Sequence, residues 1–161
     1  MRQVDTAIAL WFSEGDPVSI HTLLCAAVEI IHALHGRATG KRLFFENDAM
    51  ASVPGLVQIV KDWPNFFKHG RPHELDRVLS FNPDANLILF SACIAGLARI
   101  GAPQNDLHDA LASWFLIHEP ESFPADVRKQ RPSGETLRQI RRLSKKKFLE
   151  YHLRIARKQR H

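Results

Sequence analysis

The segment from His21 to His35 carries the side chains best suited to metal chemistry. His21, Cys25, Glu29, His32 and His35 recur at spacings that place them on one side of a helix. Glu29 and His32 also match the Glu-x-x-His spacing by which di-iron helical bundles hold a metal. Those bundles need a second such motif, which this sequence lacks, so the pattern favours a polar helix face. We therefore expect no metal cofactor, and a metal site would have to use His21, Glu29 and His32.

A second group of polar residues suits acid–base chemistry on a phosphate-containing substrate. Asn65 and His69 are four residues apart and would share a helix face, with Lys68 and Arg71 adding positive charge beside them. An imidazole can transfer protons there while the cations stabilise developing negative charge. A helix C-terminus collects Lys, His and Gly for capping reasons alone, and no partner acid or nucleophile stands nearby in the sequence. The capping interpretation is therefore favoured, and the question of enzyme activity stays open.

Positive charge is concentrated at the C-terminal end of the chain. Residues 128–161 contain thirteen Lys and Arg against Glu135 and Glu150, a local balance of +11, whereas the other 127 residues carry −6. The simpler interpretation is a solvated helix face that docks on acids of the body. The alternative is weak, non-specific RNA or DNA binding by the phosphate backbone. The docking acids would be Asp106, Asp109, Glu119 and Glu121, and the nucleic-acid-binding residues Arg138, Arg141, Arg142, Lys145, Lys146 and Lys147.

Composition indicates a globular chain. With 161 residues, 45% of them hydrophobic and 24% charged, the chain is long enough to bury a core as one domain. Its start lacks the apolar run of a signal peptide, and the apolar stretches 23–28 and 87–90 are too short to span a bilayer. We therefore expect a cytoplasmic protein without membrane contact. Cys25 and Cys93 each lie in an apolar run, which predicts buried thiols and no disulfide.

The spacing of apolar residues predicts helices throughout. Helices are expected over 4–14, 18–35, 52–69, 87–100 and 106–119, with two more behind Ser133 and Ser144. Gly15 and Gly36 are expected to end the first two helices, and Pro64 to break or kink the third. No alternating strand pattern occurs. The fold class is therefore an all-α, single-domain helical bundle of about six to seven helices. We expect residues 1–126 to form a helical core domain, flanked by a basic helical extension over 127–161.

Several segments resemble a family of bacterial all-helical proteins. The family is characterised by a Gly-Asp-Pro-Val-Ser-Ile-His-Thr-Leu segment, present here as residues 15–23, and an Asn-Phe-Phe-Lys-His motif, present here as residues 65–69. The likeness covers most of the chain and implies a helical domain without an established activity. Where the family tends to read Ala-Asp-Arg-Asp-Pro after the Lys-His pair, this chain has Gly70-Arg-Pro-His-Glu74.

The Asn-Phe-Phe-Lys-His motif is also distantly similar to HEPN domains, many of which are metal-independent ribonucleases that use Arg and His at a dimer interface. That resemblance implies roles for His69 in proton transfer, for Asn65 in phosphate positioning, and for Lys68 and Arg71 in charge stabilisation. The HEPN pattern has an Arg a few residues before the His, whereas this chain offers Lys61 further upstream.

Three hypotheses about function follow from these patterns. The preferred one is a helical interaction module, as a homodimer or with a partner protein, whose basic C-terminus binds a partner or nucleic acid. The second is a HEPN-like ribonuclease centred on His69, and the third is a metal-binding helical-bundle enzyme that uses His21, Glu29 and His32.

Overall fold

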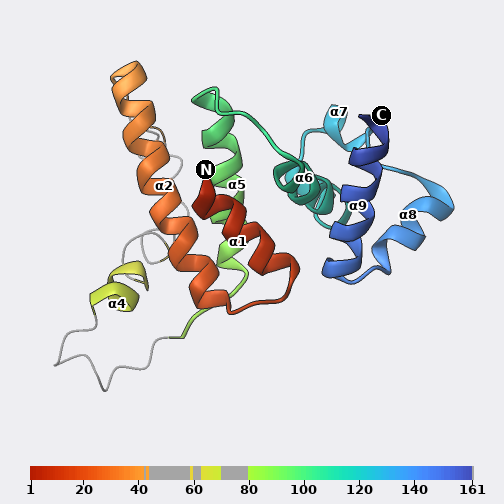
Figure 1. Cartoon of the computed structure of the whole chain (residues 1–161), viewed down its shortest axis with the longest axis horizontal. Coiled ribbons are helices and arrows are strands. Elements are labelled where there is room, and N and C mark those ends of the chain that lie inside the picture. Colours follow the sequence, from red (N-terminus) through yellow and green to blue (C-terminus); the bar gives the residue numbers. More distant parts are fainter. Residues whose placement is uncertain (42, 44–58, 60–62, 70–79, 161) are drawn as a thin grey trace. The chain divides into compact units, whose positions relative to one another are not determined.

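The fold is entirely helical over the residues that the structure describes. A computed structural model describes residues 1–41, 43, 59, 63–69 and 80–160. For residues 67–69 it describes the backbone only. These residues form eight α-helices and one 3-10 turn, with no strand, which confirms the all-α prediction and the basic C-terminal helix (Figure 1). The elements are α1 (Arg2–Phe12), α2 (Pro17–Thr39), α4 (Trp63–His69), α5 (Ala85–Arg99), α6 (Asp106–His118), η3 (Pro120–Ser122), α7 (Ala125–Arg128), α8 (Gly134–Arg141) and α9 (Lys145–Gln159).

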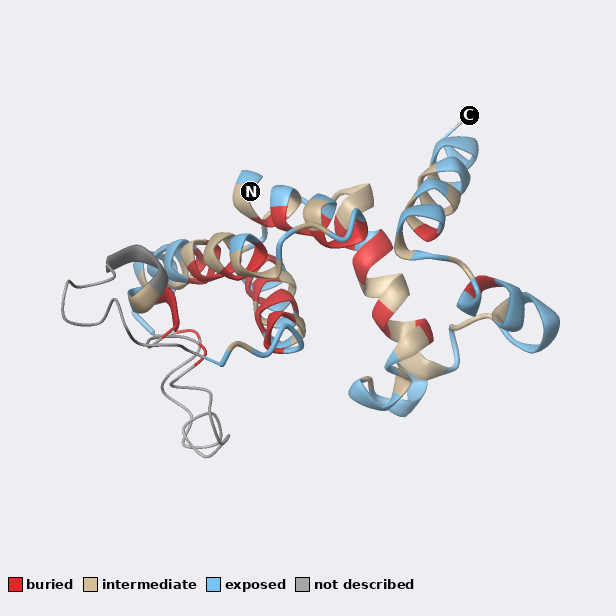
Figure 2. Cartoon of the chain, turned by 90° about the horizontal axis from the view of Figure 1, so that it is seen from below, coloured by how far each residue is buried: buried red, intermediate tan, exposed pale blue. Residues whose placement is uncertain are grey.

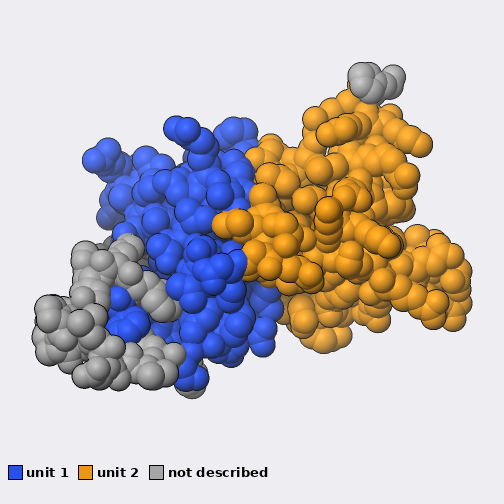
Figure 3. Space-filling view, turned by 60° about the horizontal axis from the view of Figure 1, so that its bottom comes forward, with its two compact units in different colours: residues 1–7, 16–103 blue, residues 8–15, 104–161 orange. Residues whose placement is uncertain are grey.

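The chain divides into two compact units (Figure 3). The first contains residues 1–7 and 16–103, and the second contains residues 8–15 and 104–161. Residues 104–126, which include α6, therefore group with the basic helices. The expected domain boundary after residue 126 stays a prediction, because compact units need not be separate domains.

The first unit is built on the pairing of α2 with α5. Each helix turns an apolar side to the other, and buried residues lie along both (Figure 2). Cys93 and Gly96 are buried on α5, and the Cys93 thiol lies 3.8 Å from the Leu24 carbonyl oxygen. Small side chains at these positions let the helix backbones approach closely. Both cysteines are free and buried, as the sequence predicted, and burial raises the pKa of Cys93 to about 12.

The ends of α2 show where capping patterns succeed and where they fail. Asp16 caps the first turn, its carboxylate accepting a hydrogen bond from the Ser19 backbone N–H at 2.7 Å, and Pro17 occupies the first helical position. The expected stop at Gly36 is wrong, because α2 continues to Thr39. Gly40 ends it instead, with a left-handed φ of 69° and its N–H bonded to the Gly36 carbonyl at 2.8 Å.

The end of α1 also differs from the sequence prediction. The left-handed residue after that helix is Glu14, with φ 56°, and not Gly15. Pro64 stands at the second position of α4, in its first turn, where a missing N–H costs nothing. The expected break or kink at Pro64 stays a prediction, because residues 60–62 before α4 lie outside the described residues. The first part of the expected 52–69 helix lies outside the described residues.

The second unit has an aromatic core. Trp11 and Phe12 pack there with Trp114 of α6 and Phe148 of α9. Phe12 and Phe148 stack with centroids 6.1 Å apart, and Trp114 meets Phe148 edge to face at 5.0 Å. Phe148 is only 2% exposed. The basic C-terminal helix is therefore attached to its unit by a buried aromatic ring.

Helix α2 is long and apolar enough to cross a membrane by length and composition, with 23 residues and a mean hydropathy of 1.6 in its best window. Core helices and signal sequences share these properties, so the feature by itself assigns no location. The expectation that no apolar stretch is long enough therefore does not hold for the complete helix. The side of α2 that carries Ile20, Leu24 and Ile31 is buried in the first unit, whereas Ile30 and Leu34 are exposed.

Candidate nucleic-acid interface

The cationic surface is formed by α8 and α9. Ser144 begins α9, its hydroxyl accepting a hydrogen bond from the Lys147 backbone N–H at 3.4 Å. Phe148 then points into the core of the unit, which fixes the rotation of the helix about its axis. The residues on the opposite side are exposed and mostly basic, namely Lys146, Lys147, Arg154, Arg157 and Lys158. At 100° per residue these five cations lie within an arc of roughly 120°.

Three of the six cations expected to bind nucleic acid contact other groups in the chain. Arg138 pairs with Glu135 at 2.8 Å on the surface of α8. Arg141 donates from Nε and Nη2 to the Ile117 carbonyl oxygen, at 3.2 and 3.0 Å, and so caps the end of α6. The Lys145 ammonium lies 4.0 Å from the centroid of the Trp11 ring. These contacts give the three side chains structural roles, although Arg138 and Arg141 remain exposed.

The other three expected cations are available to a ligand. Arg142, Lys146 and Lys147 are exposed, and their side chains form no ion pair or hydrogen bond with the described residues. Sequence reasoning left out three further cations of α9, Arg154, Arg157 and Lys158, which are also exposed. The helical period would have placed them away from the core, because they lie roughly 80° to 180° around the helix from the large apolar Phe148.

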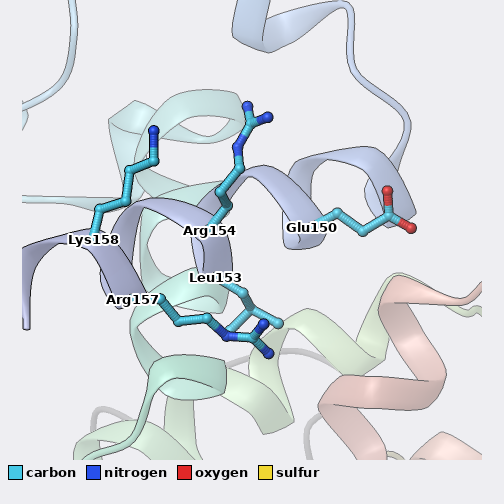
Figure 4. A pocket seen from close by; sticks show the side chains of 5 residues that line it. All are labelled: Glu150, Leu153, Arg154, Arg157 and Lys158. Atoms are coloured by element: carbon cyan, nitrogen blue, oxygen red, sulfur yellow. The ribbon is translucent and has the colours of Figure 1, made fainter. Parts of the chain in front are cut away.

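A shallow hollow of about 450 Å³ marks this surface of α9. It is lined by Glu150, Leu153, Arg154, Arg157 and Lys158 (Figure 4). Figure 4 shows Arg154 and Lys158 extending in the same direction from the helix, whereas Glu150 extends away from both of them, to the right of the view. Glu150 is the one acid of α9, and its carboxylate lowers the positive potential of the surface.

Part of the basic segment does contact acids, as the docking interpretation expects. Arg160 pairs with Asp106 at the start of α6, and Arg128 pairs with Glu121 of η3. Asp109 acts on His152 only through its charge. Docking therefore uses cations at the two ends of the segment and leaves the exposed side of α9 without acidic partners in the described part of the chain.

The residues proposed for acid–base chemistry lie at the edge of what the structure describes. Asn65 is exposed on α4, and Lys68 and His69 belong to the same helix. The side chains of Lys68 and His69, and the whole of Arg71, fall outside the described residues. The ribonuclease hypothesis therefore stays a prediction from the sequence.

The polar stripe on α2 separates into buried and exposed positions. His21 is fully buried, and its Nδ1 and Nε2 lie 2.9 Å from Asn86 Oδ1 and 3.0 Å from the Ile59 carbonyl oxygen. The rings of Trp63 and Phe81 meet its imidazole edge to face, with centroids 5.5 and 5.2 Å away. Both nitrogens of His21 are therefore engaged in joining parts of the first unit.

The other members of the stripe do not complete a metal site. Glu29 is exposed and His32 is half-buried. Among the described residues, no three His, Cys, Asp or Glu side chains come close enough together to hold a metal ion.

Burial lowers the pKa of His21, His118 and His152 below the usual value of 6.5. For His21, the hydrogen bonds to Asn86 and Ile59 oppose the lowering of the pKa. For His118, the positive charge of Arg141 lowers the pKa further. These rings bind protons less readily when folded, so the unfolded chain takes up more protons below pH 6.5. We expect the free energy of unfolding to fall as the pH drops from 7.5 to 5.5, measured by urea denaturation.

His152→Gln should make this pH dependence shallower, because one of the shifted groups is then absent. Greater stability at pH 5.5 than at 7.5 would contradict the expectation. It would show that the folded histidines retain their protons. The two oxygen acceptors around His21, Asn86 Oδ1 and the Ile59 carbonyl, would favour that protonated state.

No family model, curated protein or solved structure matches this chain. The resemblance to a bacterial helical family, carried by residues 15–23 and 65–69, therefore stays a prediction.

Proposed function

We propose that the chain binds nucleic acid without sequence preference through the exposed cations of α9 and the adjoining Arg142. The observation that carries the proposal is the arrangement of α9. Five exposed cations lie within an arc of about 120° that leaves out the buried Phe148, and Glu150 is the single acid among them. Phosphate contacts of this kind release condensed counterions, which is the main source of non-specific affinity.

The chemistry of this surface favours phosphates over bases. Neither aromatic residue of α9 lies exposed, since Phe148 is buried and Tyr151 is half-buried. The Tyr151 ring also has the Arg154 guanidinium 5.7 Å from its centroid. Proteins that prefer single strands usually offer exposed aromatic rings on which bases stack. A duplex, with its higher density of fixed phosphates, is therefore the expected ligand. We propose the cytoplasm as the compartment of the protein.

A salt titration tests the proposal. We expect a labelled duplex of about 20 base pairs to bind the full chain, with a slope near −4 for log affinity against log salt if four or five phosphates are contacted. Fluorescence anisotropy at several salt concentrations between 50 and 300 mM measures that slope. Two duplexes of unrelated sequence should bind equally well. No binding at 20 mM salt would refute the proposal and would favour an acidic protein as the partner.

A further inference from the structure

A second cavity lies within the unit formed by residues 8–15 and 104–161. It has a volume of about 240 Å³, opens to the surface, and is lined by residues of α6, residues 130–132, α8 and α9. Its wall is mainly apolar, formed by Leu116, Ile117, Pro132, Ile140, Phe148 and Ile155. Apolar cavities with a few polar groups at their edge are the usual form of small-molecule sites.

Two residues of the cavity wall indicate a ligand. Ile155 is 36% exposed, although it lies on a helix whose other exposed residues are polar. Arg131 is half-buried at the cavity, and its guanidinium forms no ion pair or hydrogen bond with the described residues. A half-buried cation without a partner and an exposed apolar side chain, both at one cavity, indicate a ligand that would satisfy the two together.

The charge of the wall selects the ligand. Among the residues that the structure describes, no Asp or Glu lines the cavity, and Arg131 is the one permanently charged residue there. His152 also lines it, and burial keeps the pKa of that imidazole low, although Asp109 and Asp106 act in the opposite direction. A neutral imidazole and the Tyr151 hydroxyl can both donate a hydrogen bond to an anion beside the Arg131 guanidinium.

The size of the cavity limits the ligand further. The volume lies just below the range of about 300 to 1,000 Å³ that is typical for drug-sized ligands. We propose that this cavity binds a small monocarboxylate with an apolar body, its carboxylate on Arg131 and its hydrocarbon against Ile140 and Ile155. This inference does not depend on nucleic-acid binding.

Octanoate is the probe, because it combines one carboxylate with a short apolar chain. We expect the full-length protein to bind octanoate saturably, with shifts of the Ile117, Ile140 and Ile155 methyl resonances in NMR spectra. Acetate lacks the apolar body and octylamine carries the opposite charge, so neither should bind at the same concentrations. Octylamine binding as tightly as octanoate would overturn the choice of an anion, and no saturable octanoate binding at millimolar concentration would overturn the site.

Variants distinguish the cavity from the cationic surface. Arg131→Gln should weaken octanoate binding by roughly ten- to a hundredfold, the usual effect of losing a hydrogen bond to a charged group. Ile155→Gln, at a partly exposed position, should weaken it with the fold intact. Arg142→Gln removes an exposed cation that does not line the cavity, so it should leave octanoate binding unchanged. Equal losses in Arg131→Gln and Arg142→Gln would overturn the proposal, because adsorption to positive charge would then explain the binding.

Discussion

Replacing Lys147, Arg154 and Lys158 together with Gln is expected to lower the affinity for duplex nucleic acid by about a hundredfold at 50 mM salt. The three side chains are exposed and lie within about 40° of one another on one flank of α9, roughly 100° around the helix from Phe148. Each lost phosphate contact removes about 0.9 from the salt slope, so the slope should become shallower by about 2.7. Anisotropy titrations across the same salt series measure both quantities.

A second triple variant tests whether position matters, or only total charge. Arg2, Arg37 and Arg99 are exposed cations of the first unit, and replacing them with Gln changes the net charge by the same amount. We expect that variant to bind the duplex nearly as well as the original chain. If both triple variants lose affinity equally, net charge and not the α9 surface drives binding.

Glu150→Gln provides a control of opposite sign. Removing this carboxylate from the midst of the cations should tighten duplex binding a few-fold, because like-charge repulsion with the phosphates disappears. An unchanged affinity would place the bound nucleic acid away from α9.

Capping residues located several helix starts but not every cap. Asp16, Asn105 and Ser144 each accept backbone hydrogen bonds at the start of a helix. Ser133 precedes α8, and Asp84 precedes α5, without a side-chain capping hydrogen bond. Gly36 misled, because a glycine is also tolerated inside a helix at moderate cost when the packing around it continues. The true stop, Gly40, adopts a left-handed φ of 69°, whereas Gly36 keeps a helical backbone, and the residue type alone does not distinguish the two.

The small residues of α5 favour a close helix contact, but they indicate neither the partner helix, which is α2, nor which of them make the contact. Cys93 and Gly96 are buried at the contact, whereas Ser91, Ala95 and Ala98 face solvent. The rotation of α5 is set by its larger neighbours Leu89, Phe90 and Leu97, which must be buried. The positions of the small residues alone do not show which side of α5 is buried.

Charge counting found the basic segment, yet it could not sort the cations by role. Arg141 and Lys145 are held by groups distant in the sequence, the Ile117 carbonyl and the Trp11 ring. The docking and binding interpretations had been treated as alternatives, and the structure shows docking contacts at Arg128 and Arg160 beside exposed cations on α9. One helix can serve both purposes because its two sides are chemically independent.

The cavity beside Arg131 left no signal in the sequence. Its wall combines residues of α6, α8 and α9 with the 130–132 segment, and such a combination depends on tertiary packing. The aromatic core of the same unit depends on packing in the same way, since Phe12 and Phe148 are 136 positions apart in the chain.

Phe148→Ala is expected to destabilise the second unit by about 3 to 5 kcal/mol, the usual cost of removing a large buried aromatic side chain. Phe148 is 2% exposed, stacks on Phe12 and meets Trp114 edge to face, so its loss leaves a cavity between three helices. A typical domain has only about 5 to 15 kcal/mol of total stability, so the loss is a large fraction. Urea denaturation followed by the fluorescence of Trp11 and Trp114 measures it.

Ile155→Ala is the matched control, because Ile155 lies two turns further along α9 and is 36% exposed. It should cost less than about 1 kcal/mol, since a partly exposed side chain gives up little buried area. A loss below about 1 kcal/mol for Phe148→Ala as well would mean that charge contacts such as Arg160 with Asp106, and not the aromatic core, hold α9 in place.

The large effect expected for Phe148 also explains why charge substitutions, and not truncation of the basic segment, must test nucleic-acid binding. Truncation after Pro132 would remove both Ile140 and Phe148 from the core, and lost binding would then report unfolding.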